Sequence, residues 1–282
     1  MPKARINDID IYYEIHGGNK AEKCICFLNG VASSVNGWYG QIEIFKKAGY
    51  KVLLHDFRGQ LLSDTPDEPY SFEQNAEDLL KLLDYLGIEK THLVGISYGG
   101  IVAIRFASLY PERVETLTGL NTLHKPDTML KLKDKSYVQR YSDYNNRNHL
   151  LNYFSDFLPV SYSYKFLAEN EKFIEERMKY IEQLPQDFLK GQMKMCHNFI
   201  NDNFDDTNLK KITCPVMIAA SENDYIAHVH YSREILKHIP HAEFVLVPDC
   251  GHTCTVEKPE TVNSIITGFI LKNDICGKIK NV

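Results

Sequence analysis

The sequence lacks the features that mark several large classes of protein. No stretch approaches the ~20 consecutive apolar residues of a membrane span, and the first residues contain no apolar signal-peptide segment. The net charge is -5 over 282 residues, and no basic stripe of the kind that binds nucleic acid is present. We therefore expect a cytoplasmic protein that binds neither membranes nor nucleic acid.

The cysteines form no recognisable zinc-binding pattern. There are seven of them, an odd number, and Cys24, Cys26 and Cys214 lie in strand-like segments, where buried, reduced thiols are the simplest interpretation. The segment Cys250-Gly-His252-Thr-Cys254 offers three close ligands, but no second Cys/His pair stands at zinc-site spacing. We predict no metal site.

Short apolar runs alternate with helical patterns along most of the chain. Continuous apolar runs at 24–28 and 51–55 are typical of strands buried on both faces of a parallel sheet. Further strands are predicted at 92–94, 114–120, 215–220 and 243–247, and an antiparallel hairpin with an Asn-Asp turn at 4–15. This alternation predicts an α/β protein with a doubly wound parallel sheet.

One helix start has a specific signature. Ser71-Phe-Glu-Gln74 has the pattern of a capping box, in which the Ser oxygen accepts a hydrogen bond from the backbone N–H three residues later. Apolar residues from Phe72 to Leu86 then share one helical face, and Gly87 ends the helix.

The segment from 121 to 207 differs from the rest because it contains no clear strand. It is too long for a loop without structure of its own, and its helical patterns include 164–184 and 186–201. We interpret residues 121–207 as a helical cap, inserted into a core made of residues 1–120 and 208–282. Its tyrosines can form an amphipathic wall for a substrate, or can simply pack the cap together; they include Tyr137, Tyr141, Tyr144, Tyr153, Tyr162 and Tyr164.

The stretch around Ser97 carries the chemistry. Gly95-Ile-Ser97-Tyr-Gly99 fits the G-x-S-x-G pattern, which places a nucleophilic Ser on a tight strand-to-helix turn. The residues two positions to either side of that Ser come very close together, so small residues are needed there. The following helix directs its N-terminus at the Ser, where its N–H groups can stabilise an oxyanion.

A Ser nucleophile needs a base, and the base needs an orienting carboxylate. Both follow Ser97 in the required order, Ser, Asp, His, and each comes just after a predicted strand. His252 is the predicted base and Asp224 the predicted acid, with Glu222 as its rival. The predicted oxyanion donors are the backbone N–H groups of Tyr98 and Val31.

These motifs resemble the α/β-hydrolase superfamily, in its branch of small serine esterases and lactonases with a helical cap. The resemblance covers nearly the whole chain and rests on Phe27-Leu-Asn-Gly30, Asp56-Phe-Arg-Gly59, the Ser97 turn, Asp224 and Gly251-His252. It implies an eight-stranded sheet, a cap between the sixth and seventh core strands, a Ser97-Asp224-His252 triad and no cofactor.

The chain departs from the family pattern at three positions. Asn29 replaces the usual His before the oxyanion Gly, Leu61 replaces a Gly, and His228 stands where Pro is common. The first and third departures affect hydrogen bonding in the pocket. We expect Asn29, Gly30 and His228 to contact substrate.

The predicted activity is cleavage of a carboxylic ester or lactone through an acyl-enzyme. A Ser at position 97 argues against the related dehalogenases and epoxide hydrolases, which use a carboxylate nucleophile. Three alternatives stay open: a C–C bond hydrolase, a thioesterase or acyltransferase acting on a carrier-bound acyl chain, and a non-catalytic receptor with the hydrolase fold.

Overall fold

The computed structural model describes residues 2–18, 23–185 and 187–279. Its centre is an eight-stranded sheet with the strand order β1-β2-β4-β3-β5-β6-β7-β8. The strands are β1 (Lys3–Ile6), β2 (Ile9–His16), β3 (Cys24–Leu28), β4 (Lys51–His55), β5 (Thr91–Ile96), β6 (Val114–Leu120), β7 (Val216–Ser221) and β8 (Glu243–Val247). Pairing is antiparallel from β1 to β4 and parallel from β4 to β8. The predicted mostly parallel, doubly wound sheet is confirmed.

The N-terminal hairpin follows from its turn residues. Asn7 and Asp8 connect β1 to β2 and adopt φ angles of 44° and 63°. Positive φ at both central residues is the requirement of the two-residue turn whose twist matches antiparallel strands, and Asn and Asp tolerate it well. The predicted hairpin over 4–15 is therefore confirmed.

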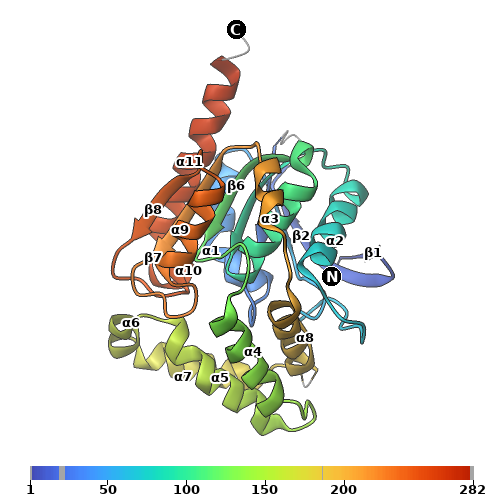
Figure 1. Ribbon diagram of the computed structural model, residues 1–282, viewed down its shortest axis with the longest axis vertical. Coiled ribbons are helices and arrows are strands. Elements are labelled where there is room, and N and C mark those ends of the chain that lie inside the picture. The colour runs from blue at the N-terminus through green and yellow to red at the C-terminus, as the bar shows by residue number, and fades with distance from the viewer. Residues whose placement is uncertain (1, 19–22, 186, 280–282) are drawn as a thin grey trace.

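Helices cover both faces of the sheet (Figure 1). Those outside the segment between β6 and β7 are α1 (Tyr39–Lys47), α2 (Phe72–Tyr85), α3 (Tyr98–Leu109), α9 (Val229–His238), α10 (Cys254–Glu257) and α11 (Pro259–Ile279), with 3₁₀ turns η1 (Val35–Trp38) and η2 (Pro111–Arg113). A third 3₁₀ turn, η3 (Asp206–Lys211), comes shortly before β7. Strand β3 shows how the two layers form. Its Cys26 and Leu28 pack with α2, α3 and α9, while Ile25 and Phe27 pack with α1 and α11 on the other face.

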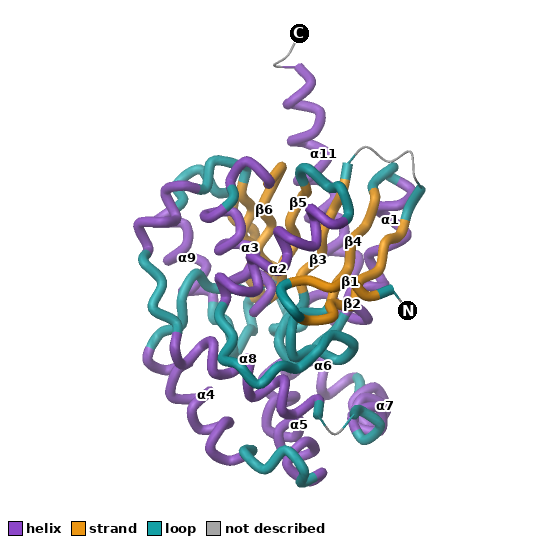
Figure 2. Tube along the Cα trace, turned by 90° about the vertical axis from the view of Figure 1, so that its right-hand side faces the viewer, coloured by secondary structure: helices purple, strands orange, loops and turns teal. Residues whose placement is uncertain are grey.

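Five described helices lie between β6 and β7, on the side where the parallel strands have their carboxyl ends (Figures 1 and 2). We call them the insertion helices; they are α4 (Thr128–Arg140), α5 (Arg147–Ser161), α6 (Tyr164–Glu169), α7 (Glu171–Ile181) and α8 (Phe188–Asn201). The helix predicted over 164–184 is divided in two, because α6 ends before Asn170 and α7 begins after it. The helix predicted from 186 begins at Phe188, and Gln186 lies outside the described residues.

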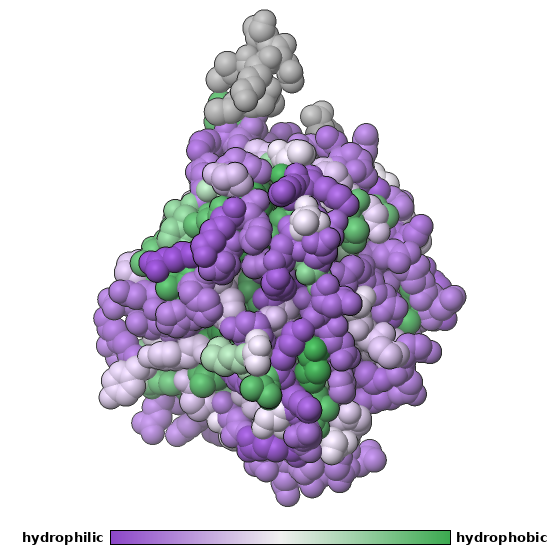
Figure 3. All heavy atoms as spheres, viewed as in Figure 1, coloured by the Kyte–Doolittle hydropathy of each residue, from purple (hydrophilic) through white to green (hydrophobic). Residues whose placement is uncertain are grey.

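The face of the molecule drawn in Figure 3 is mostly hydrophilic, with hydrophobic side chains gathered in small groups. At the edge strand β8, Phe244 and Leu246 remain partly exposed, and Figure 3 shows a hydrophobic group over this part of the molecule. None of the described helices combines the length and apolar composition needed to cross a bilayer.

The capping box of α2 yields a stability prediction. Ser71 Oγ accepts a hydrogen bond of 3.0 Å from the backbone N–H of Gln74, so Ser71→Ala leaves that N–H without its cap. We expect urea denaturation to show a loss of about 1 kcal/mol in the free energy of unfolding. As a matched control, Ser264→Ala removes an exposed hydroxyl inside α11 that bonds only to Glu260 O, and it should change stability by less than about 0.5 kcal/mol. Equal effects of the two substitutions would contradict the capping role.

Candidate active site

Ser97 lies at the turn between β5 and α3 in a strained backbone conformation. Its φ is 53° and its ψ is -120°, a combination that an L-residue adopts only when the surrounding structure enforces it. Helix α3 begins at the next residue, Tyr98, so the helix N-terminus faces the Ser97 side chain. Only 8% of the Ser97 surface is exposed.

Two glycines make this turn possible. A Cβ placed on Gly95 would lie 2.3 Å from the carbonyl oxygen of Gly99, and a Cβ on Gly99 would lie 2.2 Å from the carbonyl oxygen of Leu28. Both obstacles are backbone atoms, which cannot rotate away. The structure thus gives the physical reason for the small residues on either side of Ser97.

His252 and Asp224 meet at the carboxyl edge of the sheet. The Nδ1 atom of His252 lies 2.8 Å from Oδ2 of Asp224. The other carboxylate oxygen, Oδ1, accepts hydrogen bonds of 2.8 Å from the backbone N–H groups of Ile226 and Ala227. Both side chains are almost fully buried. Glu222, the rival acid, is exposed and instead accepts a hydrogen bond from the backbone N–H of Asp249.

Asn121 holds the loop that carries His252, a role that the sequence analysis did not predict. Its Nδ2 donates to the carbonyl oxygens of His252 at 2.7 Å and Gly251 at 3.2 Å. Its Oδ1 accepts from the N–H of Ser221, at the end of β7. The available signal was the position of Asn121 directly after β6, at the carboxyl end of a parallel strand.

The loop that follows β3 is fixed by a buried polar cluster. Asn29 Nδ2 donates to Gln60 Oε1 at 2.9 Å, and Gln60 Nε2 donates to the carbonyl oxygen of Gly30 at 2.9 Å. Asp56 accepts from the N–H of Val35 at 2.8 Å, and burial raises the pKa of its carboxyl group to about 6. This network fixes the loop in place. The loop lies beside Ser97, since a Cβ on Gly30 would be 3.6 Å from the Ser97 Cβ.

Helix α8 attaches the insertion helices to this loop. Gln192 Oε1 accepts a hydrogen bond of 2.5 Å from the N–H of Ala32. One residue earlier, Gly191 packs so closely on Gly59 that an added Cβ would lie 1.8 Å from the Gly59 carbonyl oxygen. Further along α8, Asn198 donates to the hydroxyl of Tyr98. The insertion therefore contacts both the loop after β3 and the first residue of α3, which lie on either side of Ser97.

A cavity of about 500 Å³ lies between the sheet edge and the insertion helices, within the size range of small-molecule sites. Ser97, His252, Gly30 and Val31 line it. Much of the remaining wall is apolar and comes from the insertion, including Phe154, Phe157, Leu158, Tyr162, Phe173 and Phe188. The site is thus enclosed and mostly apolar, with polar groups gathered at Ser97.

Arg177 of α7 also lines the cavity, and it is the only Lys or Arg to do so within the described parts of the chain. It is half-buried, and its Nε is buried with no hydrogen-bond partner among the described residues. Nothing in the sequence distinguishes Arg177 from the other charged residues of this segment, because the direction of its side chain depends on how α7 packs over the core.

The structure separates the predicted site residues into three groups. Gly30, Val31, Ser97 and His252 line the cavity, while Asp224 and the buried side chain of Tyr98 lie behind it. Asn29 is fully buried in the Gln60 cluster, and His228 is exposed at the start of α9. Neither of these two lines the cavity, and contact of Asn29 or His228 with substrate stays a prediction from the sequence.

Of the six tyrosines proposed for a substrate wall, only Tyr162 lines the cavity. Four of the others pack the insertion, since they lie within its hydrophobic cluster (Tyr137, Tyr141 and Tyr153) or against it (Tyr144). Tyr164 is 79% exposed.

The cysteines are consistent with inert thiols. Six of them, Cys24, Cys26, Cys196, Cys214, Cys250 and Cys254, are free and buried. Burial raises the pKa of Cys24 and of Cys250 to about 11 in each case, which keeps both thiols protonated at neutral pH.

Comparison with known proteins agrees with this geometry. A family model described as alpha/beta hydrolase fold matches residues 23–259. A relative from Caulobacter sp. (strain K31), named "Putative carbamate hydrolase RutD", is 27% identical over 268 residues, which are 92% of this chain and 95% of the relative. The "3-oxoadipate enol-lactonase 2" of Acinetobacter baylyi is 24% identical over 88% of this chain and 89% of its own. The crystal structure of MGS-M2, an alpha/beta hydrolase enzyme from a Medee basin deep-sea metagenome library, has a TM-score of 0.88 and 28% identity, and the match covers 95% of this chain and 96% of that one.

The glycine contacts at the turn yield a prediction with an opposite-sign control. Gly99→Ala forces a Cβ against the Leu28 carbonyl oxygen, so we expect it to lower the free energy of unfolding by about 3 kcal/mol, the upper end of the usual overpacking cost. Gly268→Ala places a Cβ in open space at an exposed position of α11 and should raise stability by about 0.5–1 kcal/mol. Chemical denaturation of the two variants measures both effects. A Gly99→Ala protein as stable as the parent would contradict the close contact.

Proposed function

The chain belongs to the alpha/beta hydrolase family, and we propose that it is a serine hydrolase that cleaves a small carboxylic ester or lactone through an acyl-enzyme. The observation that carries this proposal is the hydrogen bond of 2.8 Å between His252 and Asp224, on an imidazole that lines the same cavity as the strained Ser97.

Each member of the proposed triad has a distinct role. His252 accepts the proton of Ser97 Oγ as that oxygen attacks the substrate carbonyl carbon. Asp224 fixes the ring through Nδ1, which directs Nε2 toward the nucleophile and stabilises the imidazolium that forms. The two backbone N–H groups on Asp224 Oδ1 hold that carboxylate in place.

The reaction then proceeds in two halves. The backbone N–H groups of Tyr98 and Val31 stabilise the oxyanion of the tetrahedral intermediate. His252 gives its proton to the leaving oxygen, and the C–O bond of the substrate breaks to leave an acyl group on Ser97. A water molecule, deprotonated by His252, attacks this acyl-enzyme, and the acid product leaves as the Ser97 hydroxyl is restored.

The cavity favours a substrate with an apolar body and an acidic end. The aromatic wall from α5 and α7 suits an apolar acyl or ring portion, and Arg177 places a guanidinium, the group that pairs best with a carboxylate, on the cavity wall. A relative named 3-oxoadipate enol-lactonase acts, by its name, on the lactone of a dicarboxylic acid. We therefore propose that the ester or lactone carries a carboxylate that pairs with Arg177.

Carbamate hydrolysis is the second candidate. Five relatives named as putative carbamate hydrolases are 27–28% identical over 92–99% of this chain. The same Ser97 attack would serve a carbamate carbonyl, with release of an amine or ammonia. A cavity of about 500 Å³ is larger than an unsubstituted carbamate needs, and for that reason we rank the ester or lactone first.

The proposed nucleophile yields a prediction about turnover. Ser97→Ala removes the proposed nucleophile while keeping a small residue, and it should lower kcat on the best substrate by roughly 10⁴-fold or more. A panel of graded p-nitrophenyl esters, lactones, carbamates, acyl thioesters and a diketone identifies that substrate and separates the alternative activities. Unchanged folding, measured by circular dichroism, is the control. Parent-like turnover by Ser97→Ala would refute the mechanism.

A further prediction concerns the proposed role of Arg177 in substrate recognition. Arg177→Leu should lower kcat/KM for a monoester of a dicarboxylic acid by roughly 10- to 100-fold, the usual worth of a hydrogen bond to a charged group. Neutral esters of equal length should change little, because they do not need the guanidinium. Lys179→Leu, an exposed change on the same helix, is the matched control and should affect neither substrate. Equal losses on charged and neutral esters would rule out carboxylate recognition.

A further inference from the structure

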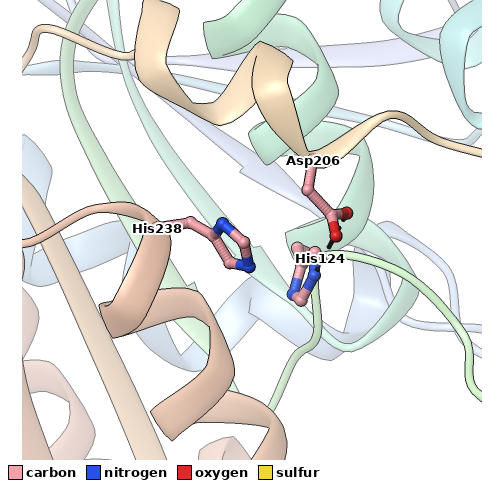
Figure 4. A group of neighbouring side chains, drawn as sticks. All are labelled: His124, Asp206 and His238. Carbon is pink, nitrogen blue, oxygen red and sulfur yellow. Dashed lines mark ion pairs between the residues drawn. The ribbon is translucent and has the colours of Figure 1, made fainter.

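Two histidines and one aspartate meet away from the cavity (Figure 4). His124 lies in the connection from β6 to α4, Asp206 is the first residue of η3, and His238 is the last residue of α9. One ligand atom from each lies within 4.8 Å of the other two, and His124 Nε2 is 3.4 Å from Asp206 Oδ1. None of the three lines the cavity at Ser97.

The pairing of these groups is incomplete without a further partner. His124 is only 5% exposed, and both of its ring nitrogens are buried with no hydrogen-bond partner among the described residues. Asp206 Oδ1 is buried and unpartnered in the same way. Buried polar atoms are nearly always paired, because leaving them unpaired costs stability. An imidazole and a carboxylate oxygen directed at each other therefore point to a ligand between them.

Two neighbouring cations, Lys125 and Arg105, hold Asp206 and His124 in place. Lys125 Nζ bonds to the second carboxylate oxygen of Asp206, which orients the group and leaves Oδ1 free. Arg105 NH1 donates to the main-chain carbonyl oxygen of His124 and fixes that residue, but its guanidinium is paired with Glu73 and Asp202.

We propose that His124, Asp206 and His238 bind a single Zn²⁺ ion. Two imidazoles and one carboxylate are a donor set that Zn²⁺ accepts readily, with water in the fourth position. Zn–N and Zn–O bonds of about 2.0–2.1 Å place tetrahedral ligands roughly 3.4 Å apart, which matches the distance between His124 Nε2 and Asp206 Oδ1. Mg²⁺ and Ca²⁺ prefer all-oxygen sets and are disfavoured here.

The proposed site would join three separate parts of the chain. His124 lies where the chain leaves β6 for the insertion helices, and Asp206 lies where it returns toward β7. His238 belongs to α9, which packs against the sheet. A bound ion would therefore tie both ends of the insertion to the core. Its effect would be on stability and not on the chemistry at Ser97, because no ligand reaches the cavity.

The test is to remove metal from the protein with a chelator and then to measure binding of added Zn²⁺. The parent should bind one equivalent of Zn²⁺ in calorimetric titration, and its Tm should rise by about 5 °C when zinc is present at roughly 100 times Kd. Mg²⁺ should produce no shift. Co²⁺ as a substitute should give the intense visible absorption of a tetrahedral site.

Two variants and one control decide the assignment. His238→Ala and Asp206→Asn should each weaken zinc binding by more than roughly 100-fold, with parent-like circular dichroism in the absence of metal. His230→Ala removes an exposed histidine from the same helix and should bind zinc like the parent. Failure of the parent to bind zinc, or equal binding by the parent and both ligand variants, would overturn the proposal.

Discussion

The close approach of the Gly99 backbone to the Leu28 carbonyl oxygen is the constraint on which the candidate site depends. It holds the first turn of α3 against the end of β3, and Ser97 adopts its φ of 53° in the tight turn from β5 into α3. The same contact brings the loop that carries Val31 beside the N-terminus of α3. The nucleophile and both proposed oxyanion donors are therefore positioned by one backbone packing arrangement, which requires glycine and a tightly paired parallel sheet.

Much of the fold and the candidate catalytic residues could be predicted from the sequence, because those residues follow strands. Ser97, Asp224 and His252 come directly after β5, β7 and β8, and the carboxyl ends of parallel strands meet at one edge. The mostly parallel sheet and the N-terminal hairpin followed from local apolar patterns and turn residues. Asn29 lies outside the cavity wall because a residue at a strand end can also face inward, and here its amide joins the buried Gln60 cluster.

The insertion was the least predictable part, since its side chains are directed by packing between helices and not by a strand end. Arg177 and the aromatic wall could not be chosen over the other charged and aromatic residues of 121–207 for that reason. The structure also shows that the insertion does more than cover the cavity. Gln192 bonds to the N–H of Ala32, the neighbour of Val31, so the position of α8 affects the proposed oxyanion loop.

The central claim is that Ser97 is a nucleophile activated by the His252–Asp224 pair. The most direct measurement is reaction of the purified protein with a fluorophosphonate, followed by mass spectrometry of the intact chain and of its peptides. The account predicts a single phosphonyl adduct, located on Ser97, which forms much more slowly in a His252→Ala protein. Absence of any adduct, or an adduct on another residue, would contradict it.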